Sequence, residues 1–346
     1  MVSFAGLNQD AVMMQERVER FTAARNAILA QVREVIVGQQ EVLDQILIAV
    51  FVGGHCLLTG MPGTAKTLMV RTLADALGLE FRRIQFTPDL MPSDITGTDI
   101  IEEDLETGRR RWTFVPGPIF GNVLLADEIN RTPPKTQSAL LEAMQEHCCT
   151  VRGHLYRLPA PFFVLATQNP IELEGTYPLP EAQLDRFLFN SILDDLSADD
   201  ELQVIDRTTA TRTTAVKPVT TADELLDFQQ LVRMVPIAET LARYVISLVR
   251  ATRPKSENAP DFVKKYANYG ASVRAAQFVV LAAKARALSH RRYHVTYDDI
   301  TAVLAPVLRH RVLLNFHAES DHVDADEILR QLVAYVPRPT ERSRES

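Results

Sequence analysis

Residues 60–67, with the sequence GMPGTAKT, have the pattern of a phosphate-binding loop. Gly60 and Gly63 allow the backbone to wrap closely, so that successive N–H groups can point at phosphate oxygens. Lys66 can reach the β- and γ-phosphates of a nucleotide, and the hydroxyl of Thr67 can bind Mg²⁺. The motif therefore predicts a site for a nucleoside triphosphate.

One position departs from the strict pattern, which has glycine directly before the lysine. Ala65 stands there instead, and its methyl group is the smallest side chain that could intrude on the loop. The alternative interpretation of the segment is a Gly/Pro turn before an ordinary helix with a solvated lysine.

Two carboxylates follow an apolar run at residues 123–126, which is typical of a buried strand. In a parallel sheet, the carboxyl end of this strand lies beside the phosphate loop. Asp127 could then hold Mg²⁺, directly or through water, and Glu128 could act as general base toward an attacking water molecule. Taken alone, the pair could equally be surface acids at the end of a strand.

A third polar group follows the apolar run at residues 162–167, where Gln168 and Asn169 precede Pro170. The amide of Asn169 could orient the water molecule near the γ-phosphate. An asparagine that forms a turn before proline explains the same residues equally well.

The elements that must position these residues alternate along the chain. Apolar periodicity predicts helices at residues 15–35, 41–52, 66–78 and 135–147, and strands at 55–59, 81–86, 123–126 and 162–167. Hairpins are expected at 98–115 and 150–158, and three helices at 237–252, 272–289 and 297–308. Alternating strands and helices predict a parallel sheet covered on both faces, followed by a helical part.

Composition excludes several classes of protein. The length of 346 residues predicts about two domains, and 46% hydrophobic with 23% charged residues is ordinary for a folded protein. No apolar run approaches the roughly 18 residues that span a bilayer, and we expect no membrane insertion. Three cysteines favour a reducing cytoplasm. The net charge of −7 argues against indiscriminate nucleic-acid binding.

Four segments together resemble the MoxR family of AAA+ ATPases: GMPGTAKT, LLADEINRTPPKTQSALLEAMQE at 124–146, ATQNP at 166–170 and GTYPLPEAQLDRF at 175–187. The resemblance covers about residues 35–289 and continues more weakly beyond. It implies an α/β AAA+ P-loop NTPase core with a parallel sheet between helices, followed by a small all-α lid. We expect the core at 1–225 with an insert at about 88–122, the lid at 226–336, and a flexible tail at 337–346.

The resemblance also implies roles for individual residues, with Ala65 matching the residue usual in the family. Lys66 and Thr67 match Walker A, Asp127 and Glu128 match Walker B, and Asn169 matches sensor 1. The implied catalytic residues are Glu128, Asn169, Arg186 and Arg274, and the implied metal ligands are Thr67 and Asp127. The implied nucleotide-binding residues are Val37, Gly38, Gly60, Met61, Pro62, Gly63, Thr64, Ala65, Lys66, Thr67, Leu68 and Asp127.

Two of these arginines have rival interpretations. Arg186 resembles an arginine finger offered to a neighbouring subunit, but it could be a cation at the end of a helix. Arg274 resembles a sensor 2 arginine, but it could be a surface residue of a helix capped by Ser272. Arg131 is a rival for the trans-acting arginine, ranked lower because it follows the Walker B acids so closely.

By resemblance, the chain is a cytoplasmic, Mg²⁺-dependent ATPase that forms a homo-oligomeric ring, expected to be a hexamer, and that activates or matures a client protein. The implied client contains a von Willebrand factor A domain, sometimes with metal or cofactor insertion. Two alternatives share the phosphate loop: an AAA+ nucleic-acid motor or loader, and a small-molecule phosphotransferase. The acidic balance of residues 1–230 disfavours the motor, and the trans arginine has no place in the phosphotransferase.

Overall fold

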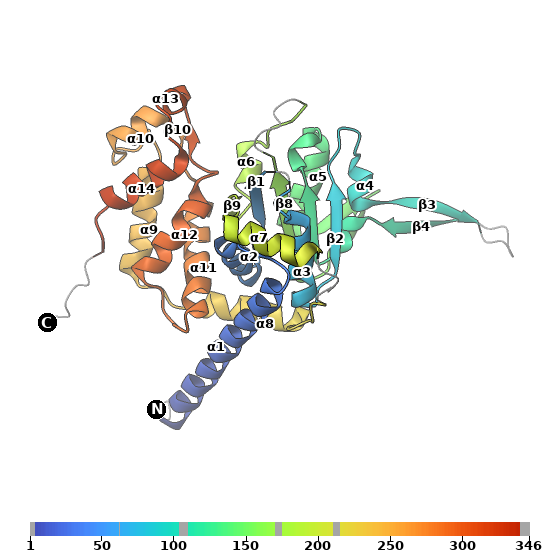
Figure 1. Ribbon diagram of the computed structural model, residues 1–346, viewed down its shortest axis with the longest axis horizontal. Coiled ribbons are helices and arrows are strands. Elements are labelled where there is room, and N and C mark those ends of the chain that lie inside the picture. Colours follow the sequence, from blue (N-terminus) through green and yellow to red (C-terminus); the bar gives the residue numbers. More distant parts are fainter. Residues whose placement is uncertain (1–3, 62, 104–109, 170–174, 210–214, 340–346) are drawn as a thin grey trace.

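A sheet of five parallel strands forms the centre of the protein, and its strand order is β2-β5-β8-β1-β9 (Figure 1). The computed structural model describes residues 4–61, 63–103, 110–169, 175–209 and 215–339. The strands are β1 Cys56–Gly60, β2 Phe81–Gln85, β5 Val123–Asp127, β8 Phe163–Gln168 and β9 Phe189–Leu193. The sequence predicted four of them but not β9, which follows Arg186.

Helices cover both faces of the sheet because its strands are apolar on both sides. In β5, Val123 and Leu125 belong to one hydrophobic core, while Leu124 and Ala126 belong to the other, as the two-residue period of a strand requires. The first core includes α1 Phe4–Arg33, α2 Gln40–Val52 and α3 Lys66–Leu77, and the second includes α5 Pro134–Glu146. All four helices were predicted, although α1 begins earlier than expected and its first turns project from the body (Figure 1).

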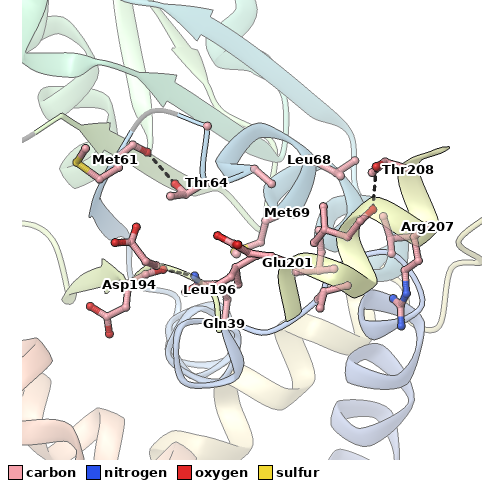
Figure 2. A pocket seen from close by; sticks show the side chains of 17 residues that line it. Gln39, Met61, Thr64, Leu68, Met69, Asp194, Leu196, Glu201, Arg207 and Thr208 are labelled. Carbon is pink, nitrogen blue, oxygen red and sulfur yellow. Dashed lines mark hydrogen bonds between the residues drawn. The ribbon is translucent and has the colours of Figure 1, made fainter. Parts of the chain in front are cut away.

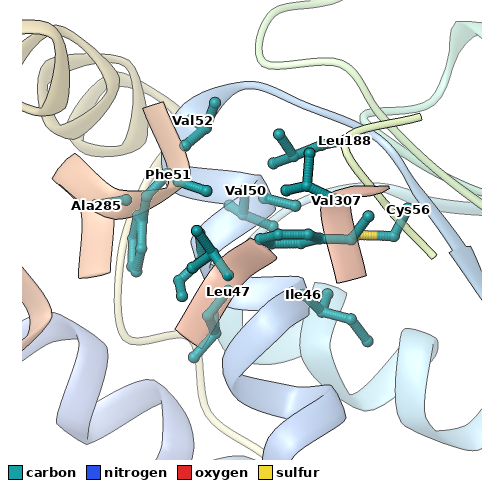
Figure 3. Packing of buried hydrophobic residues seen from close by; sticks show 14 of the residues in the cluster. Ile46, Leu47, Val50, Phe51, Val52, Cys56, Leu188, Ala285 and Val307 are labelled. Carbon is teal, nitrogen blue, oxygen red and sulfur yellow. The ribbon is translucent and has the colours of Figure 1, made fainter. Parts of the chain in front are cut away.

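Helix α2 joins the sheet to the C-terminal helices. It is buried almost all round, which is typical of a helix inside a core. Figure 3 shows its Phe51 and Val50 packed among Cys56 of β1, Leu188, and Ala285 and Val307 of the C-terminal helices. The hydrophobic core is therefore continuous from the sheet into the C-terminal part of the chain.

Two hairpins lie beside the second core, as the sequence predicted. β3 Gly97–Glu103 pairs antiparallel with β4 Arg110–Pro116, and β6 Cys148–Val151 pairs with β7 His154–Arg157. The long hairpin projects from the body (Figure 1). It starts at Gly97, which has a φ of +90°; a Cβ at this position would lie 2.3 Å from the carbonyl oxygen of Val115, so only glycine fits. The expected turn of this hairpin at 106–108 lies outside the described residues.

Short elements complete the core: α4 Pro92–Thr96, η1 Pro118–Phe120, η2 Ile129–Arg131, α6 Glu181–Leu184, α7 Ala198–Thr209 and α8 Ala222–Met234. The sequence did not predict α7 or α8. The expected domain boundary at 225–226 falls inside α8, whose Phe228 packs edge-on against Phe21 of α1 and Phe51 of α2. That boundary stays a prediction.

The C-terminal helices comprise α9 Glu239–Ala251, α10 Asp261–Tyr266, α11 Val273–Ser289, α12 Tyr297–Leu308, α13 Phe316–Ser320 and α14 Ala325–Tyr335, with a small ladder of β10 Ala267–Tyr269 and β11 Leu313–Leu314. The three helices predicted here are α9, α11 and α12. The expected tail lies outside the described residues from position 340 onward. Within the described part of the chain, no helix has both the length and the apolarity to cross a membrane.

A buried charge cluster ties α11 to the start of α12. Asp299 is completely buried and accepts hydrogen bonds from Arg286 at 2.7 Å, from Arg292 at 2.6 and 2.7 Å, and from the Thr296 hydroxyl at 2.8 Å. Burial alone would raise the pKa of Asp299, but the bonds from Arg292, Thr296 and Arg286 outweigh it and lower the pKa to about 2.

This cluster predicts a pH-dependent share of the stability. Because the pKa of Asp299 lies below its value in an unfolded chain, the ionised carboxylate contributes about 2 kcal/mol above pH 4, and this is lost as the pH falls through about 2. We expect Asp299→Asn to lower the free energy of unfolding at pH 7 by at least that amount. The difference between variant and wild type should shrink toward pH 2 in denaturant titrations.

The neighbouring Asp298 is exposed and provides the matched control. Asp298→Asn should change the free energy of unfolding by less than about 0.5 kcal/mol. A wild-type-like stability for Asp299→Asn at pH 7 would contradict the assignment.

Candidate nucleotide-binding site

The phosphate loop lies between β1 and α3, the position that the sequence predicted. Gly60 ends β1, and a Cβ at this position would lie 2.8 Å from the Cβ of Leu193, so β9 leaves no room for a side chain. Gly63 has a φ of +87°, and the hydroxyl of Thr64 donates to the carbonyl of Met61 at 2.9 Å. Pro62, also predicted to bind nucleotide, lies outside the described residues.

Ala65 is strained through its backbone. It precedes the first residue of α3 with φ 56° and ψ 26°, in the left-handed region that favours glycine. From the sequence, only the size of the methyl group was expected to matter. The structure shows that the preference for glycine at this position concerns backbone conformation.

Lys66 begins α3 and lies between the loop and the acids. Its Nζ donates to the Gly60 carbonyl at 2.5 Å. Partial burial lowers the pKa of Lys66, while the nearby Asp127 and Glu128 act in the opposite direction. The charged ammonium is thus held among backbone and carboxylate oxygens at the start of the helix.

One hydroxyl group holds Asp127 and Glu128 together. Thr167, at the end of β8 and 1% exposed, donates to Oδ1 of Asp127 at 2.7 Å and accepts from the backbone N–H of Glu128 at 2.8 Å. Glu128 has a left-handed φ of 56°, which turns the chain out of β5. Thr167 was not predicted from the sequence, although its place before Gln168 and Asn169 at a strand end was a usable signal.

The neighbouring strand β2 contributes two more residues that were not predicted from the sequence. Arg83 pairs with Oδ2 of Asp127 at 2.7 Å, and Gln85 donates to Oε2 of Glu128 at 3.0 Å. Arg131 also reaches Oε2 of Glu128, at 3.0 Å. Gln85 pairs in register with Asp127, so the parallel pairing of β2 with β5 brings these groups together. Both acids are therefore fixed by cationic or amide donors.

The residues that follow Glu128, up to position 146, include Gln137, which stabilises the turn after the acids. This residue of α5 is fully buried, and its amide donates to the carbonyls of Ile129, Thr132 and Tyr177 at 2.9–3.2 Å. The turn that follows Glu128 is thereby fixed to α5.

A cleft of about 420 Å³ joins the phosphate loop to the acids. It is lined by Gly63, Thr64, Ala65, Lys66, Thr67, Leu68, Asp127, Glu128, Thr167 and Asn169. The structure thus brings the predicted Walker A, Walker B and sensor 1 residues to one cavity. Asn169 is 7% exposed and lies at the end of β8, as expected.

A second, more apolar cavity of about 340 Å³ continues from the same loop (Figure 2). In Figure 2, Met61 and Thr64 lie on one side and Gln39 and Asp194 on the other. Further lining residues come from the segment after α1, from α3, from the residues that lead into α7 and from α7 itself: Val35, Ile36, Val37, Leu68, Met69, Leu196, Glu201, Val204, Arg207 and Thr208. Its size and apolar walls suit a nucleobase.

Gly38, predicted to bind nucleotide, does not line this cavity. Its φ is +66°, and a Cβ there would lie 2.8 Å from Cδ2 of Leu196. Gly38 therefore lets the segment after α1 pack closely against the residues that lead into α7. The α7 wall was missed from the sequence; Arg207 holds it by donating to the carbonyls of Arg33 and Glu34 at 2.8 and 3.2 Å.

Arg186 and Arg274 line neither cavity of their own chain. The guanidinium of Arg186 donates to the carbonyl of Leu141 in α5. Arg274, in the first turn of α11, lies 3.9 Å from Oδ2 of Asp185. The structure therefore separates these two arginines from the residues that surround the phosphate cleft, whereas Arg131 lies against Glu128.

The donors in the cleft fit the groups that the motif implies. A hydroxyl from Thr67 and a carboxylate from Asp127 are hard oxygen donors, which Mg²⁺ prefers. The described residues hold no cluster of three or more His, Cys, Asp or Glu side chains that could bind a metal ion.

Two family models match the chain. Residues 55–189 match the ATPase family associated with various cellular activities (AAA), and residues 261–332 match the AAA lid domain. The crystal structure of a candidate ATPase from Cytophaga hutchinsonii has a TM-score of 0.88 and 40% identity, covering 96% of this chain and 99% of that one. Fold and phosphate loop define an AAA+ P-loop ATPase, with the parallel sheet and helical lid expected from the sequence.

Individual relatives show to which family of AAA+ ATPases the chain belongs. The YeaC protein of Bacillus subtilis is 42% identical over 90% of this chain and 94% of its own length. The chaperone MoxR1 of Mycobacterium tuberculosis is 42% identical over 89% of this chain and 81% of its own length. The MoxR protein of Paracoccus denitrificans is 32% identical over 83% of this chain and 87% of its own length. The chain belongs to the MoxR family of AAA+ ATPases, which confirms the resemblance.

The strain at Ala65 yields a prediction. Glycine adopts the left-handed region freely, so Ala65→Gly should raise the free energy of unfolding by about 1 kcal/mol. The matched control is Ala276→Gly, at the fourth residue of α11, where glycine should lower stability by about 1 kcal/mol. Denaturant titrations of the two variants should therefore shift in opposite directions, and a loss of stability in both would contradict the proposed strain.

Proposed function

We propose that this chain is a Mg²⁺-dependent ATPase that works as a ring and remodels or matures a client protein. The observation that carries the proposal is the single cleft in which Lys66, Thr67, Asp127, Glu128 and Asn169 converge. A phosphate loop alone would serve binding. A carboxylate and an amide at the same cleft supply what hydrolysis needs in addition.

Each group then has a defined task. Backbone N–H groups of the loop and Lys66 bind the phosphates, while the apolar cavity at Val37 and Leu68 takes the base. Thr67 and Asp127 would hold Mg²⁺, which neutralises charge on the phosphate oxygens. Asn169 orients the attacking water, and Glu128 accepts its proton.

Glu128 can act as a base through Oε1, or through Oε2 once the neighbours of that oxygen are exchanged. Its Oε2 accepts a hydrogen bond from Gln85 at 3.0 Å and forms an ion pair with Arg131 at 3.0 Å in the present arrangement. Oε1 or a rotated carboxylate can face the cleft, because Glu128 lines it. Gln85 and Arg131 thus hold the base in a defined place until the water is positioned.

Arg186 is our candidate for the residue that completes the site of a neighbouring subunit. It lies outside both cavities of its own chain, on a segment that begins after α6. A guanidinium supplied across an interface stabilises the charge that develops on the transferred phosphoryl group. We infer a homo-oligomeric ring, a hexamer by family resemblance, and rank Arg131 second because it is bound to Glu128 of its own chain.

We propose chaperone activity because a relative that is 42% identical is named as the chaperone MoxR1. The family resemblance further suggests a client with a von Willebrand factor A domain, metal or cofactor insertion during its maturation, and a cytoplasmic site of action. The exposed side chains Ile101, Trp112 and Leu155 on the two hairpins, between 53% and 62% exposed, offer apolar surface for a polypeptide client.

A nucleic-acid motor is the weaker alternative. The basic residues of the long hairpin are compensated: Arg110 pairs with Glu103 at 3.1 Å, and Arg111 lies 3.9 Å from Glu102. Arg152 covers one face of the Trp112 ring, with its guanidinium 4.2 Å from the ring centroid, so that face is already occupied and cannot stack on a base. Arg109 lies outside the described residues.

The ring mechanism predicts a large defect for Arg186→Ala. The turnover number for ATP should fall by about 10³-fold or more, while binding of a fluorescent ATP analogue to the variant's own cleft should be unchanged. Wild-type turnover per chain should rise with protein concentration as rings assemble. Arg243→Ala, on the exposed face of α9, is the matched control and should keep wild-type turnover. Wild-type turnover by Arg186→Ala at all concentrations would contradict a role for this arginine.

Glu128→Gln tests the client. The variant should bind ATP but not hydrolyse it, because the amide cannot accept the proton from water, and a ring stalled with ATP should retain its client. Affinity capture with this variant and ATP, followed by mass spectrometry, should enrich a protein with a von Willebrand factor A domain relative to capture with Lys66→Ala. Enrichment of nucleic acid instead, with turnover stimulated by single-stranded DNA, would favour the motor.

A further inference from the structure

The chain segment that carries Arg186 is held by the lid of the same molecule. Arg311 follows α12, and its side chain is 2% exposed. Its Nε donates to Oδ1 of Asp185, the residue before Arg186, at 2.8 Å. A buried lid arginine therefore forms an ion pair with Asp185, whose side chain is 22% exposed and which is the direct neighbour of the proposed trans-acting arginine.

The same guanidinium also fixes the backbone on both sides of Arg186. Its Nη2 donates to the carbonyls of Asp185 at 2.9 Å and Phe187 at 2.5 Å, and Nη1 donates to that of Leu188 at 3.4 Å. A ring nitrogen of His310 lies 3.2 Å from the Phe187 carbonyl as well. Two consecutive lid residues therefore occupy every backbone carbonyl from 185 to 188 except that of Arg186.

A second lid element reaches the same carboxylate. Ser272, which caps the first turn of α11, donates to Oδ2 of Asp185 at 3.0 Å, and Arg274 lies 3.9 Å from that oxygen. Asp185 thus joins the start of α11 to the end of α12. The guanidinium of Arg186 itself points elsewhere, toward the Leu141 carbonyl in α5.

The stability of the fold alone does not require an ion pair between Arg311 and Asp185. Burial lowers the pKa of Arg311 to about 10, with Asp185 acting in the opposite direction, so a desolvated charge is retained here at neutral pH. A buried ion pair stabilises a fold no better than well-packed apolar side chains do, but it defines geometry, because a planar guanidinium with five donors admits one orientation of its acceptors. The geometry defined here is that of the segment containing Arg186.

On the basis of the proposed function, in which Arg186 acts on a neighbouring subunit, we propose that Asp185 and Arg311 are positioning residues for this arginine. They bind the Arg186 segment to lid helices α11 and α12, so that the lid sets where Arg186 meets the next subunit. Neither residue lines the phosphate cleft or the base cavity. Movement of the lid in one subunit is thereby transmitted to hydrolysis in its neighbour.

Asp185→Asn tests the proposal. The variant keeps the shape of the side chain but removes the charge that pairs with Arg311. The turnover number should fall about 10- to 100-fold, as expected when a catalytic group is displaced by about 1 Å, while the affinity for a fluorescent ATP analogue and ring assembly stay at wild-type values. The matched control is Asp321→Asn, which breaks an ion pair with Lys265 inside the lid and should leave turnover unchanged.

Mixed rings separate a trans role from a merely structural one. Chains with Glu128→Gln cannot hydrolyse ATP but carry a normal Arg186, and Asp185→Asn chains have an intact cleft. When the two are mixed, turnover should exceed the sum of the separate preparations, because Glu128→Gln neighbours supply a well-placed arginine. Arg186→Ala mixed with Glu128→Gln is the reference, and wild type mixed with Glu128→Gln calibrates the effect of stalled neighbours.

The outcomes distinguish the two proposals. Turnover above the sum of the separate preparations, here called recovery, supports the positioning role when it is seen in both mixtures. Recovery with Arg186→Ala but not with Asp185→Asn overturns the positioning role and leaves the ring mechanism intact. Recovery in neither mixture overturns the trans arginine and the positioning role with it. If thermal unfolding shows that Asp185→Asn does not fold, Arg311→Lys, which keeps the charge but loses the planar set of donors, undergoes the same mixtures.

Discussion

The nucleotide site depends on the parallel pairing of β5 with β8. Because both strands end at the same edge of the sheet, the hydroxyl of Thr167 at the end of β8 can donate to Asp127 and accept from the N–H of Glu128 at the end of β5. This hydroxyl group fixes the relative position of the predicted metal ligand and the predicted base. A shift of one residue in the register would turn Thr167 to the other face of the sheet and separate the two acids.

The site also concentrates backbone strain and charge. Ala65 and Glu128 both adopt left-handed conformations, one where the loop enters α3 and one where the chain leaves β5. Asp127 and Glu128 are balanced by Lys66, Arg83 and Arg131 within the described chain. Strained residues of this kind persist where the surrounding structure determines them from several sides, which here means β2, β8 and α5.

The connection between sheet and lid has two parts with different chemistry. Helix α2 is apolar almost all round and joins the sheet to α11 and α12 through one continuous core. The contact between Asp185 and Arg311 is polar and directional. Apolar packing tolerates small sliding movements, whereas a bidentate or forked hydrogen-bond set does not, so the segment with Arg186 follows the lid more strictly than the rest of the core does.

The sequence by itself determined the fold class, four of the five strands, the phosphate loop, and the acids and amide of the cleft, because each of these depends on local patterns: an apolar run, a glycine-rich turn, a polar residue at the end of a strand. It did not reveal β9, which is only five residues long, or α7, which has no buried residue. Only the tertiary structure placed Thr167, Arg83 and Gln85 against the acids and Arg311 against Asp185. The last of these contacts spans 126 residues of chain, and a contact between distant residues is set by the packing of strands and helices, which no local pattern records.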